Sequence, residues 1–106
     1  PLSEPVIRAP LAFCDARSVR PVDLVPCPII YPDRRGEIYE LRYHPDQRWF
    51  WFPRMRKDEV VVFKGHDSAE GAATRHVPHT AFDPEDLPED APERRSIEVR
   101  AFCFLP

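Results

Sequence analysis

Glycine is scarce in this sequence, with three residues in 106, whereas proline is abundant, with fourteen. Proline cannot donate a backbone hydrogen bond, so helix interiors and central strands exclude it. The composition therefore favours short strands and extended connections over helices. No apolar run approaches the ~20 residues that a membrane-spanning helix needs. No signal-peptide pattern opens the chain either.

An excess of basic residues is also lacking, because the formal net charge is −3. Surfaces that bind nucleic acid usually carry a basic stripe, so this class of partner is not expected. The three cysteines, Cys14, Cys27 and Cys103, are odd in number and far apart, without a CxxC pair. They predict neither a disulfide framework nor a zinc site. Small buried thiols in a reducing, cytoplasmic compartment are expected instead.

The chain begins without methionine, and residues 1–5 have the composition of a connection rather than of a start. A length of 106 residues suffices for one small domain or for part of a larger one. We therefore expect residues 1–106 to form a single partial domain, the C-terminal part of a longer polypeptide.

Alternation of apolar and polar residues predicts short strands, mostly in the second half of the chain. A turn at residues 44–47 joins the first two of them, which predicts a hairpin. The strands are expected at residues 37–43, 48–52, 59–64, 74–82 and 96–104.

Proline and turn residues organise the remaining segments. Two prolines interrupt residues 25–31, which favours an edge strand or strap before a turn at 31–37. Ser18 is a fair N-cap for a single helical turn. Three prolines and many acidic residues predict an exposed acidic, proline-rich loop at 83–95. Five or more short strands with little helix predict an all-β antiparallel sandwich or jelly roll.

His79 is the first candidate for chemistry. Strand alternation places it on one face with Val77 and Ala81, which are small and apolar, and places His76 on the opposite, exposed face. Such a setting suits an inward-pointing metal ligand. The competing interpretation is a histidine that is hydrogen-bonded in the core or at the surface.

Arg100 is the second candidate, because both faces of the predicted strand around it are apolar. A buried guanidinium needs an anionic partner. That partner is either a bound carboxylate or an ion pair with Glu98 or a neighbouring strand, and the sequence leaves both open. Weaker candidates for a substrate pocket are Trp49, Trp51, Lys64 and His66.

Six segments, in matching order, resemble the CmcJ/NvfI (AsaB-like hydroxylase/desaturase) oxidoreductases of secondary metabolism. The likeness covers nearly the whole chain and is specific as a set. The segments are CDARS (14–18), YPDR (31–34), WFWFP (49–53), FKGHDS (63–68), PHTAFD (78–83) and SIEVR (96–100).

This resemblance implies part of a double-stranded β-helix (jelly-roll or cupin-like) of a non-haem Fe(II)/2-oxoglutarate dioxygenase. His79 would be the distal iron-binding histidine, and Arg100 would bind the far carboxylate of 2-oxoglutarate. The family's H-x-D, which supplies two further ligands, would lie before Pro1, so the chain alone is expected to be inactive. His66 departs from the aromatic residue expected at its position, which suggests a role in the substrate pocket.

Three functional hypotheses follow. The first is an oxidoreductase that hydroxylates or desaturates a small molecule, with the missing ligands supplied upstream, by a partner chain or by a homo-oligomer. The second is a non-catalytic β-sandwich module that binds a partner or a small molecule of a biosynthetic complex. The third is a truncated product that folds poorly because it exposes unpaired strand edges. None of them involves a nucleic acid or a membrane.

Overall fold

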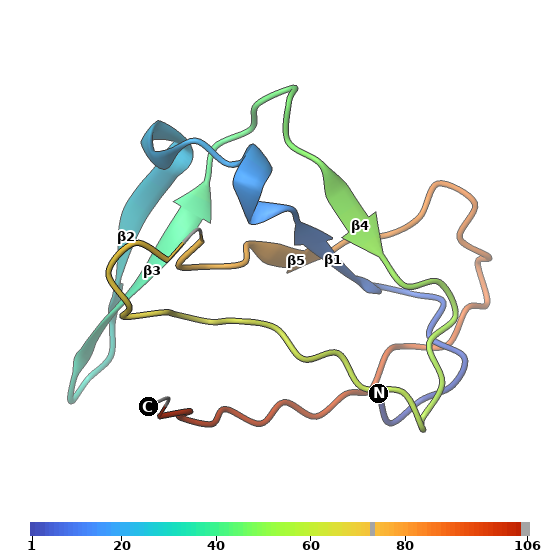
Figure 1. The fold of residues 1–106 in the computed structure, drawn as a ribbon. Coiled ribbons are helices and arrows are strands. Elements are labelled where there is room, and N and C mark those ends of the chain that lie inside the picture. The colour runs from blue at the N-terminus through green and yellow to red at the C-terminus, as the bar shows by residue number, and fades with distance from the viewer. Residues whose placement is uncertain (73, 105–106) are drawn as a thin grey trace. The chain divides into compact units, whose positions relative to one another are not determined.

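The computed structural model describes residues 1–72 and 74–104, which divide into two compact units. Unit 1 comprises residues 1–11, 52–62 and those from 81 onward, and unit 2 comprises residues 12–51 and 63–80. No α-helix occurs in the described part of the chain (Figure 1). The elements are β1 (Leu11–Cys14), the 3₁₀ turns η1 (Ala16–Ser18) and η2 (Pro21–Asp23), β2 (Leu24–Ile30), β3 (Arg35–Leu41), β4 (Trp49–Trp51) and β5 (His79–Ala81).

Strands β2 and β3 form an antiparallel hairpin around the predicted turn (Figure 1). The backbone N–H of Tyr31 donates to the carbonyl of Arg34 at 2.9 Å and closes that turn. Pro26 and Pro28 lie opposite Tyr39 and Glu37. Because alternate residues of a two-stranded ladder turn their N–H outward, two prolines spaced by two lose no ladder bond. The edge strand predicted from the prolines is confirmed.

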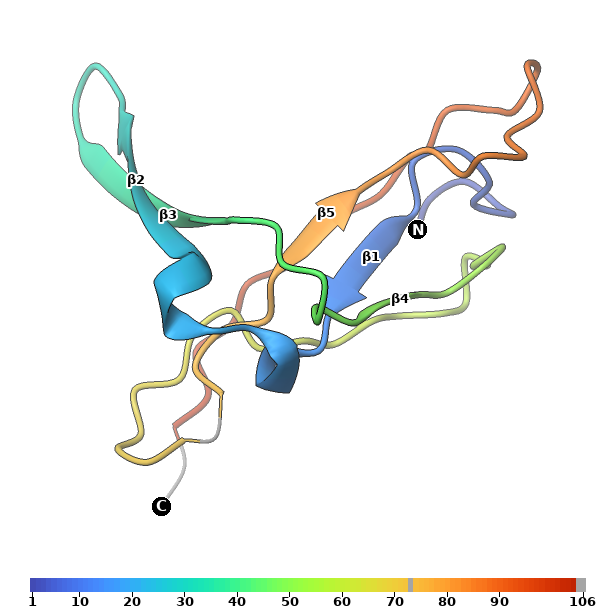
Figure 2. The same cartoon turned by 90° about the horizontal axis from the view of Figure 1, so that it is seen from above.

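The second sheet has the strand order β4-β1-β5, which Figure 2 shows side by side. Strands β1 and β4 are antiparallel, with Ala12, Phe13 and Cys14 opposite Trp51, Phe50 and Trp49. The N–H of Cys14 also donates to the carbonyl of Pro78 at 2.8 Å, just before β5. Ala12 and Cys14 are buried and share one face of β1, so this face supplies the core of unit 2.

The predicted hairpin between residues 37–43 and 48–52 is wrong. Strand β3 pairs with β2 through the tighter turn at 31–34, and β4 pairs with β1. Both segments form the predicted strands, but strand signals in a sequence do not specify which edge a strand will join. The single helical turn predicted after Ser18 is found as two 3₁₀ turns, of which η1 is capped by Asp15 instead.

Two further predicted strands, at 59–64 and 96–104, do not form ladders in the described part of the chain. Both segments belong to unit 1 apart from residues 63–64, and their β-branched side chains are exposed: Val60 is 82% and Val99 83% accessible. Of the predicted strand at 74–82, residues 79–81 form β5. A strand needs a hydrogen-bonding neighbour, which sequence propensity alone does not provide.

Unit 1 is held by contacts between the start of the chain and the acidic segment 83–95. Arg8 donates from Nε to the carbonyl of Ala91 at 3.1 Å and from Nη2 to that of Glu89 at 3.3 Å. The N–H of Ala9 donates to Oδ1 of Asp83 at 3.2 Å. Ala91 is buried, whereas most side chains of this segment are exposed.

Asp15 organises one end of β1 in unit 2. Its carboxylate accepts from the Nε and Nη2 of Arg17 at 2.9 and 2.8 Å and from the Nη2 of Arg48 at 2.7 Å. It also accepts from the backbone N–H of Arg17 at 3.0 Å and so caps η1. The hydrogen bonds from Arg17 lower the pKa of Asp15 to about 2.

The Asp15→Asn variant is expected to lower Tm by about 5 °C at pH 7, because the cap and both ion pairs weaken. A folded-state pKa below the unfolded value stabilises the fold above the unfolded pKa. The difference in Tm should therefore shrink as the pH falls from about 4 to about 2. Thermal unfolding followed by circular dichroism across this range measures it.

Asp58→Asn is the matched control, since the side chains of Asp58 and its partner Arg56 are 64% and 65% exposed. A pair this exposed contributes little to stability. An equal loss of Tm in both variants at pH 7, or a loss at Asp15 that does not change down to pH 2, would contradict the assigned role of Asp15.

Candidate functional site

His79 begins β5 and lies among aromatic side chains of unit 2. Its ring centroid is 4.6 Å from that of Phe63 and 6.2 Å from that of Phe13, and the two phenyl rings are 5.0 Å apart. Phe13 comes from β1 and Phe63 from the connection before β5. Sequence reasoning did not single out either phenylalanine, although their apolar runs were recognised. The imidazole is therefore flanked by apolar rings while its residue remains exposed.

A hydrogen bond fixes the proton on the His79 ring. Nδ1 lies 3.0 Å from the carbonyl oxygen of Val77. A carbonyl can only accept, so Nδ1 carries the proton and the neutral ring keeps its lone pair on Nε2. Metal-binding histidines typically have this arrangement, in which the distal nitrogen donates to a backbone carbonyl. His79 therefore fits the role of a nitrogen ligand.

His44-Pro45-Asp46 has the H-x-D spacing of an iron-binding pair, and sequence reasoning passed over it as a turn. The structure also places it in a turn. Here Nδ1 of His44 accepts from the backbone N–H of Asp46 at 3.3 Å, and the carboxylate of Asp46 lies 3.6 Å from the same nitrogen. The neutral His44 ring thus has its proton on Nε2, the opposite of His79, and its side chain is engaged with its own turn.

Lys64 and Asp67 close the loop that precedes β5. The Nζ of Lys64 donates to Oδ2 of Asp67 at 2.6 Å and to the carbonyl of Thr74 at 3.3 Å. The hydrogen bond from Lys64 lowers the pKa of Asp67. Lys64, one of the weaker candidates for a substrate pocket, binds a carboxylate of its own chain here.

His66 lies in the same loop, and its ring centroid is 5.1 Å from that of His76. His76 is also 5.3 Å from the ring of Tyr39 in β3, and its Nδ1 lies 3.2 Å from the carbonyl of Gly65. The prediction that His76 is exposed is wrong, since this residue is half-buried. What the sequence analysis missed is that His76 lies across the loop from Gly65 and His66.

Trp49 and Trp51 lie in β4 and are 41% and 39% exposed. Directly opposed residues of an antiparallel pair point to the same side, so both tryptophans share the face of Cys14 and Ala12. Phe13, which contacts His79, belongs to the other face. The structure therefore does not bring these two tryptophans together with His79.

Arg100 belongs to unit 1, and its side chain is 91% exposed. Its Nε donates to Oε1 of Glu98 at 2.6 Å, the ion pair that the sequence left open as one alternative. The prediction of a buried arginine within a strand is wrong, because residues 96–104 join no ladder and leave Arg100 in solvent.

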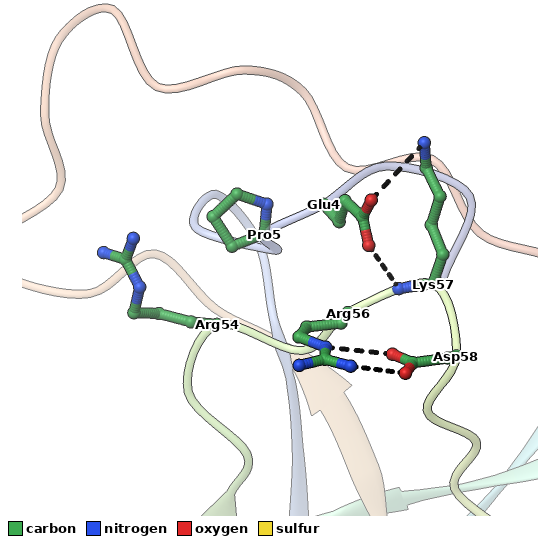
Figure 3. A pocket seen from close by; sticks show the side chains of 6 residues that line it. All are labelled: Glu4, Pro5, Arg54, Arg56, Lys57 and Asp58. Atoms are coloured by element: carbon green, nitrogen blue, oxygen red, sulfur yellow. Dashed lines mark hydrogen bonds and ion pairs between the residues drawn. The ribbon is translucent and has the colours of Figure 1, made fainter.

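An open cavity of about 680 Å³ lies in unit 1 near the first residues (Figure 3). Among its charged side chains, Glu4 accepts from the backbone N–H of Lys57 at 2.9 Å, and Arg56 binds Asp58. None of the predicted site residues lines it. The lining residues are Glu4, Pro5, Arg54, Arg56, Lys57 and Asp58.

Two features are absent from residues 1–72 and 74–104. No group of three or more histidine, cysteine, aspartate or glutamate side chains is arranged to hold a metal ion. Among the same residues, no helix is long and apolar enough to cross a membrane.

Comparison with known families decides the affiliation. Residues 1–104 match the family described as oxidoreductase/YMDC permease-like domain. The chain belongs to this oxidoreductase family. The chain is 37% identical to the Fe(II)/2-oxoglutarate-dependent dioxygenase nvfI of Aspergillus novofumigatus, over 98% of this chain and 38% of that protein. It is 34% identical to the hydroxylase/desaturase asaB of Aspergillus flavus, over 96% and 51% respectively. The resemblance found in the sequence is confirmed.

The family membership agrees with a solved structure. The iron and alpha-ketoglutarate-dependent endoperoxidase NvfI superposes with a TM-score of 0.77 and 35% identity, over 87% of this chain and 34% of that one. The all-β fold, as part of a double-stranded β-helix with little helix, is thereby confirmed. The chain spans between about a third and a half of the length of these relatives.

Proposed function

We propose that this chain contributes a histidine ligand, His79, to the iron site of an Fe(II)/2-oxoglutarate-dependent oxygenase. The hydrogen bond of 3.0 Å from Nδ1 to the carbonyl of Val77 carries the proposal, because it leaves the Nε2 lone pair available to a metal. Bound iron and 2-oxoglutarate would supply the activation of O₂. His79 would hold the metal, while Phe13 and Phe63 would keep water from the ring edges.

The proposed substrate is a small molecule of secondary metabolism, and the proposed reaction is a hydroxylation or desaturation. The activities of the relatives support this class, since these proteins are a dioxygenase and hydroxylase/desaturases. We further propose a cytoplasmic location, which agrees with three cysteines that are free in the described part of the chain.

Iron sites of this type use two histidines and one carboxylate. His79 provides one of the three, and the turn bonds of His44 and Asp46 argue against that pair as the others. We therefore propose that the remaining ligands come from outside residues 1–106, on the same polypeptide, on a partner chain or on a second copy. The chain alone would then be inactive.

Arg100 is proposed to bind the far carboxylate of 2-oxoglutarate, for which its exposed guanidinium offers a bidentate fork. Glu98 competes for the same group and would have to release it. His66, at 5.1 Å from His76, is proposed as a contact to the substrate. The proposal gives Trp49 and Trp51 no part in the iron site, because they share the other face of their sheet.

Anaerobic titration with Fe(II) and then 2-oxoglutarate tests the function, because a chelated 2-oxo acid on Fe(II) gives a visible charge-transfer band. The expected result is a band when the missing ligands are present and none from the folded chain alone. A band that survives the His79→Ala substitution would overturn the assignment.

A non-catalytic binding module is the second candidate. Exposed aromatic side chains in β4 and directly after it favour this candidate. Phe50 and Phe52 are 56% and 51% accessible and alternate along the chain with the two tryptophans. Aromatic residues are enriched where proteins bind partners. Under this alternative, Phe50→Ala would abolish capture of a partner while His79→Ala would leave it unchanged, and iron would have no effect on either.

A further inference from the structure

The loop before β5 is connected to His79 through a single residue, Val77. The carbonyl of Val77 accepts from Nδ1 of His79 at 3.0 Å, and its N–H donates to the carbonyl of Lys64 at 3.2 Å. The N–H and the carbonyl of Val77 lie in successive peptide units that meet at its Cα, so Val77 links Lys64, which closes the loop, to the imidazole of His79. A shift of Lys64 would move the acceptor that sets the proton on His79.

Lys64 is fixed at this point by three interactions. Its backbone carbonyl accepts from Val77, and its Nζ donates to Asp67 and to the carbonyl of Thr74. The Lys64 and Asp67 side chains are 41% and 28% exposed, so this ion pair is partly screened from water. The side chain spans the loop from one arm to the other, as a clamp does.

A second connection runs beside this clamp. The Nδ1 of His76 lies 3.2 Å from the carbonyl of Gly65, so the residues that flank the Lys64–Val77 bond are themselves joined across the loop. The two connections keep the arms of the loop at a fixed separation. Only the Lys64 side chain adds a charge-assisted bond, which is the stronger kind.

We propose that Lys64 is a positioning residue: by closing the loop through Asp67 and Thr74, it holds the Val77 peptide so that its carbonyl keeps the His79 proton on Nδ1. Lys64 touches neither metal nor substrate in this role. The inference rests on the proposed function only for the reason why the tautomer matters. The hydrogen bonds themselves are those of the metal-free protein.

The experiment reads the tautomer of His79 directly, in metal-free full-length chain labelled with ¹⁵N, from long-range ¹H–¹⁵N spectra of the histidine rings. Wild type is expected to favour the Nδ1–H form by about fivefold, the effect of one net hydrogen bond. Lys64→Met is expected to lose this preference, and Lys64→Arg to restore it. Asp67→Asn, which keeps the bond to Thr74, is expected to lose part of it.

Lys57→Met is the matched control, because Lys57 is a similarly exposed lysine beside a carboxylate, Glu4, in unit 1. It should leave the His79 tautomer unchanged. Amide dispersion in each variant verifies that the chain is folded, and Asp67→Asn keeps the test decisive if Lys64→Met unfolds. An Nδ1–H preference that stays at its wild-type value in Lys64→Met, or in Asp67→Asn, would overturn the inference. So would its absence in wild type.

This outcome is separate from the test of the iron site. The tautomer is measured without metal, so an iron titration that fails would leave the role of Lys64 standing. Conversely, His79 could bind iron while its tautomer does not depend on Lys64. That result would remove the positioning role of Lys64 and leave the proposed function intact.

Discussion

The His79→Ala variant is expected to bind Fe(II) at least about 100-fold more weakly than wild type, when the remaining ligands are present. Loss of an outer partner of a metal ligand already costs 10- to 100-fold in affinity, and loss of the ligand itself should cost more. His79 is suited to this role because its proton is held on Nδ1 by Val77 and its ring is flanked by Phe13 and Phe63. Anaerobic competition with a chromogenic chelator measures the Kd.

His44→Ala provides the control for His79→Ala. His44 is also a histidine of unit 2, and it belongs to the one H-x-D of the chain. Its Nδ1 accepts from the N–H of Asp46, so its ring is committed to the turn. The variant should keep the affinity for Fe(II) within about twofold of wild type, as expected for a site without a metal contact. If His44→Ala weakened binding as much as His79→Ala, the turn would be part of the site.

The second large effect is expected at Arg100. Arg100→Ala should raise the KM for 2-oxoglutarate by about 10- to 100-fold, the value of a charge-assisted hydrogen bond of 1.5–3 kcal/mol. Glu98→Gln should lower the KM, because the arginine no longer has to leave an ion pair of 2.6 Å before it binds the co-substrate. Initial rates of 2-oxoglutarate turnover, with the complete ligand set, measure both.

The opposite signs of these two changes distinguish the roles of Arg100. If the guanidinium serves only its ion pair with Glu98, removal of either partner breaks the same interaction. Both variants would then give the same KM for 2-oxoglutarate as wild type. Arg35→Ala is a suitable control, since Arg35 is an exposed arginine in β3 of the other unit.

The sequence predicted local structure well where the signal was local. Pro26 and Pro28 identified an edge strand because proline spacing alone determines which N–H groups a ladder must spare. The turn at residues 31–34 was equally readable, since proline, aspartate and glycine each favour a defined backbone geometry. The family resemblance added the β-helix, which no local pattern could supply.

Partner choice could not be predicted in this way. The segments 48–52 and 96–104 were both predicted to be strands, yet the first pairs with β1 and the second has no strand assignment in the described part of the chain. The side chain of Arg100 is exposed because the segment that carries it is not part of a sheet. The tautomer of His79 could not be predicted from the sequence either. It depends on the direction of the Val77 carbonyl, which the backbone conformation sets.

The most direct test of the central claim is to follow the histidine rings of the ¹⁵N-labelled chain, with the remaining ligands present, while Fe(II) is added without oxygen. If Nε2 of His79 binds the metal, its ring signals should broaden before those of His44, His66 and His76. Selective broadening at His79 is the predicted result. Broadening that begins at His66 and His76, whose rings are 5.1 Å apart, with His79 unchanged, would contradict the assignment of the iron ligand.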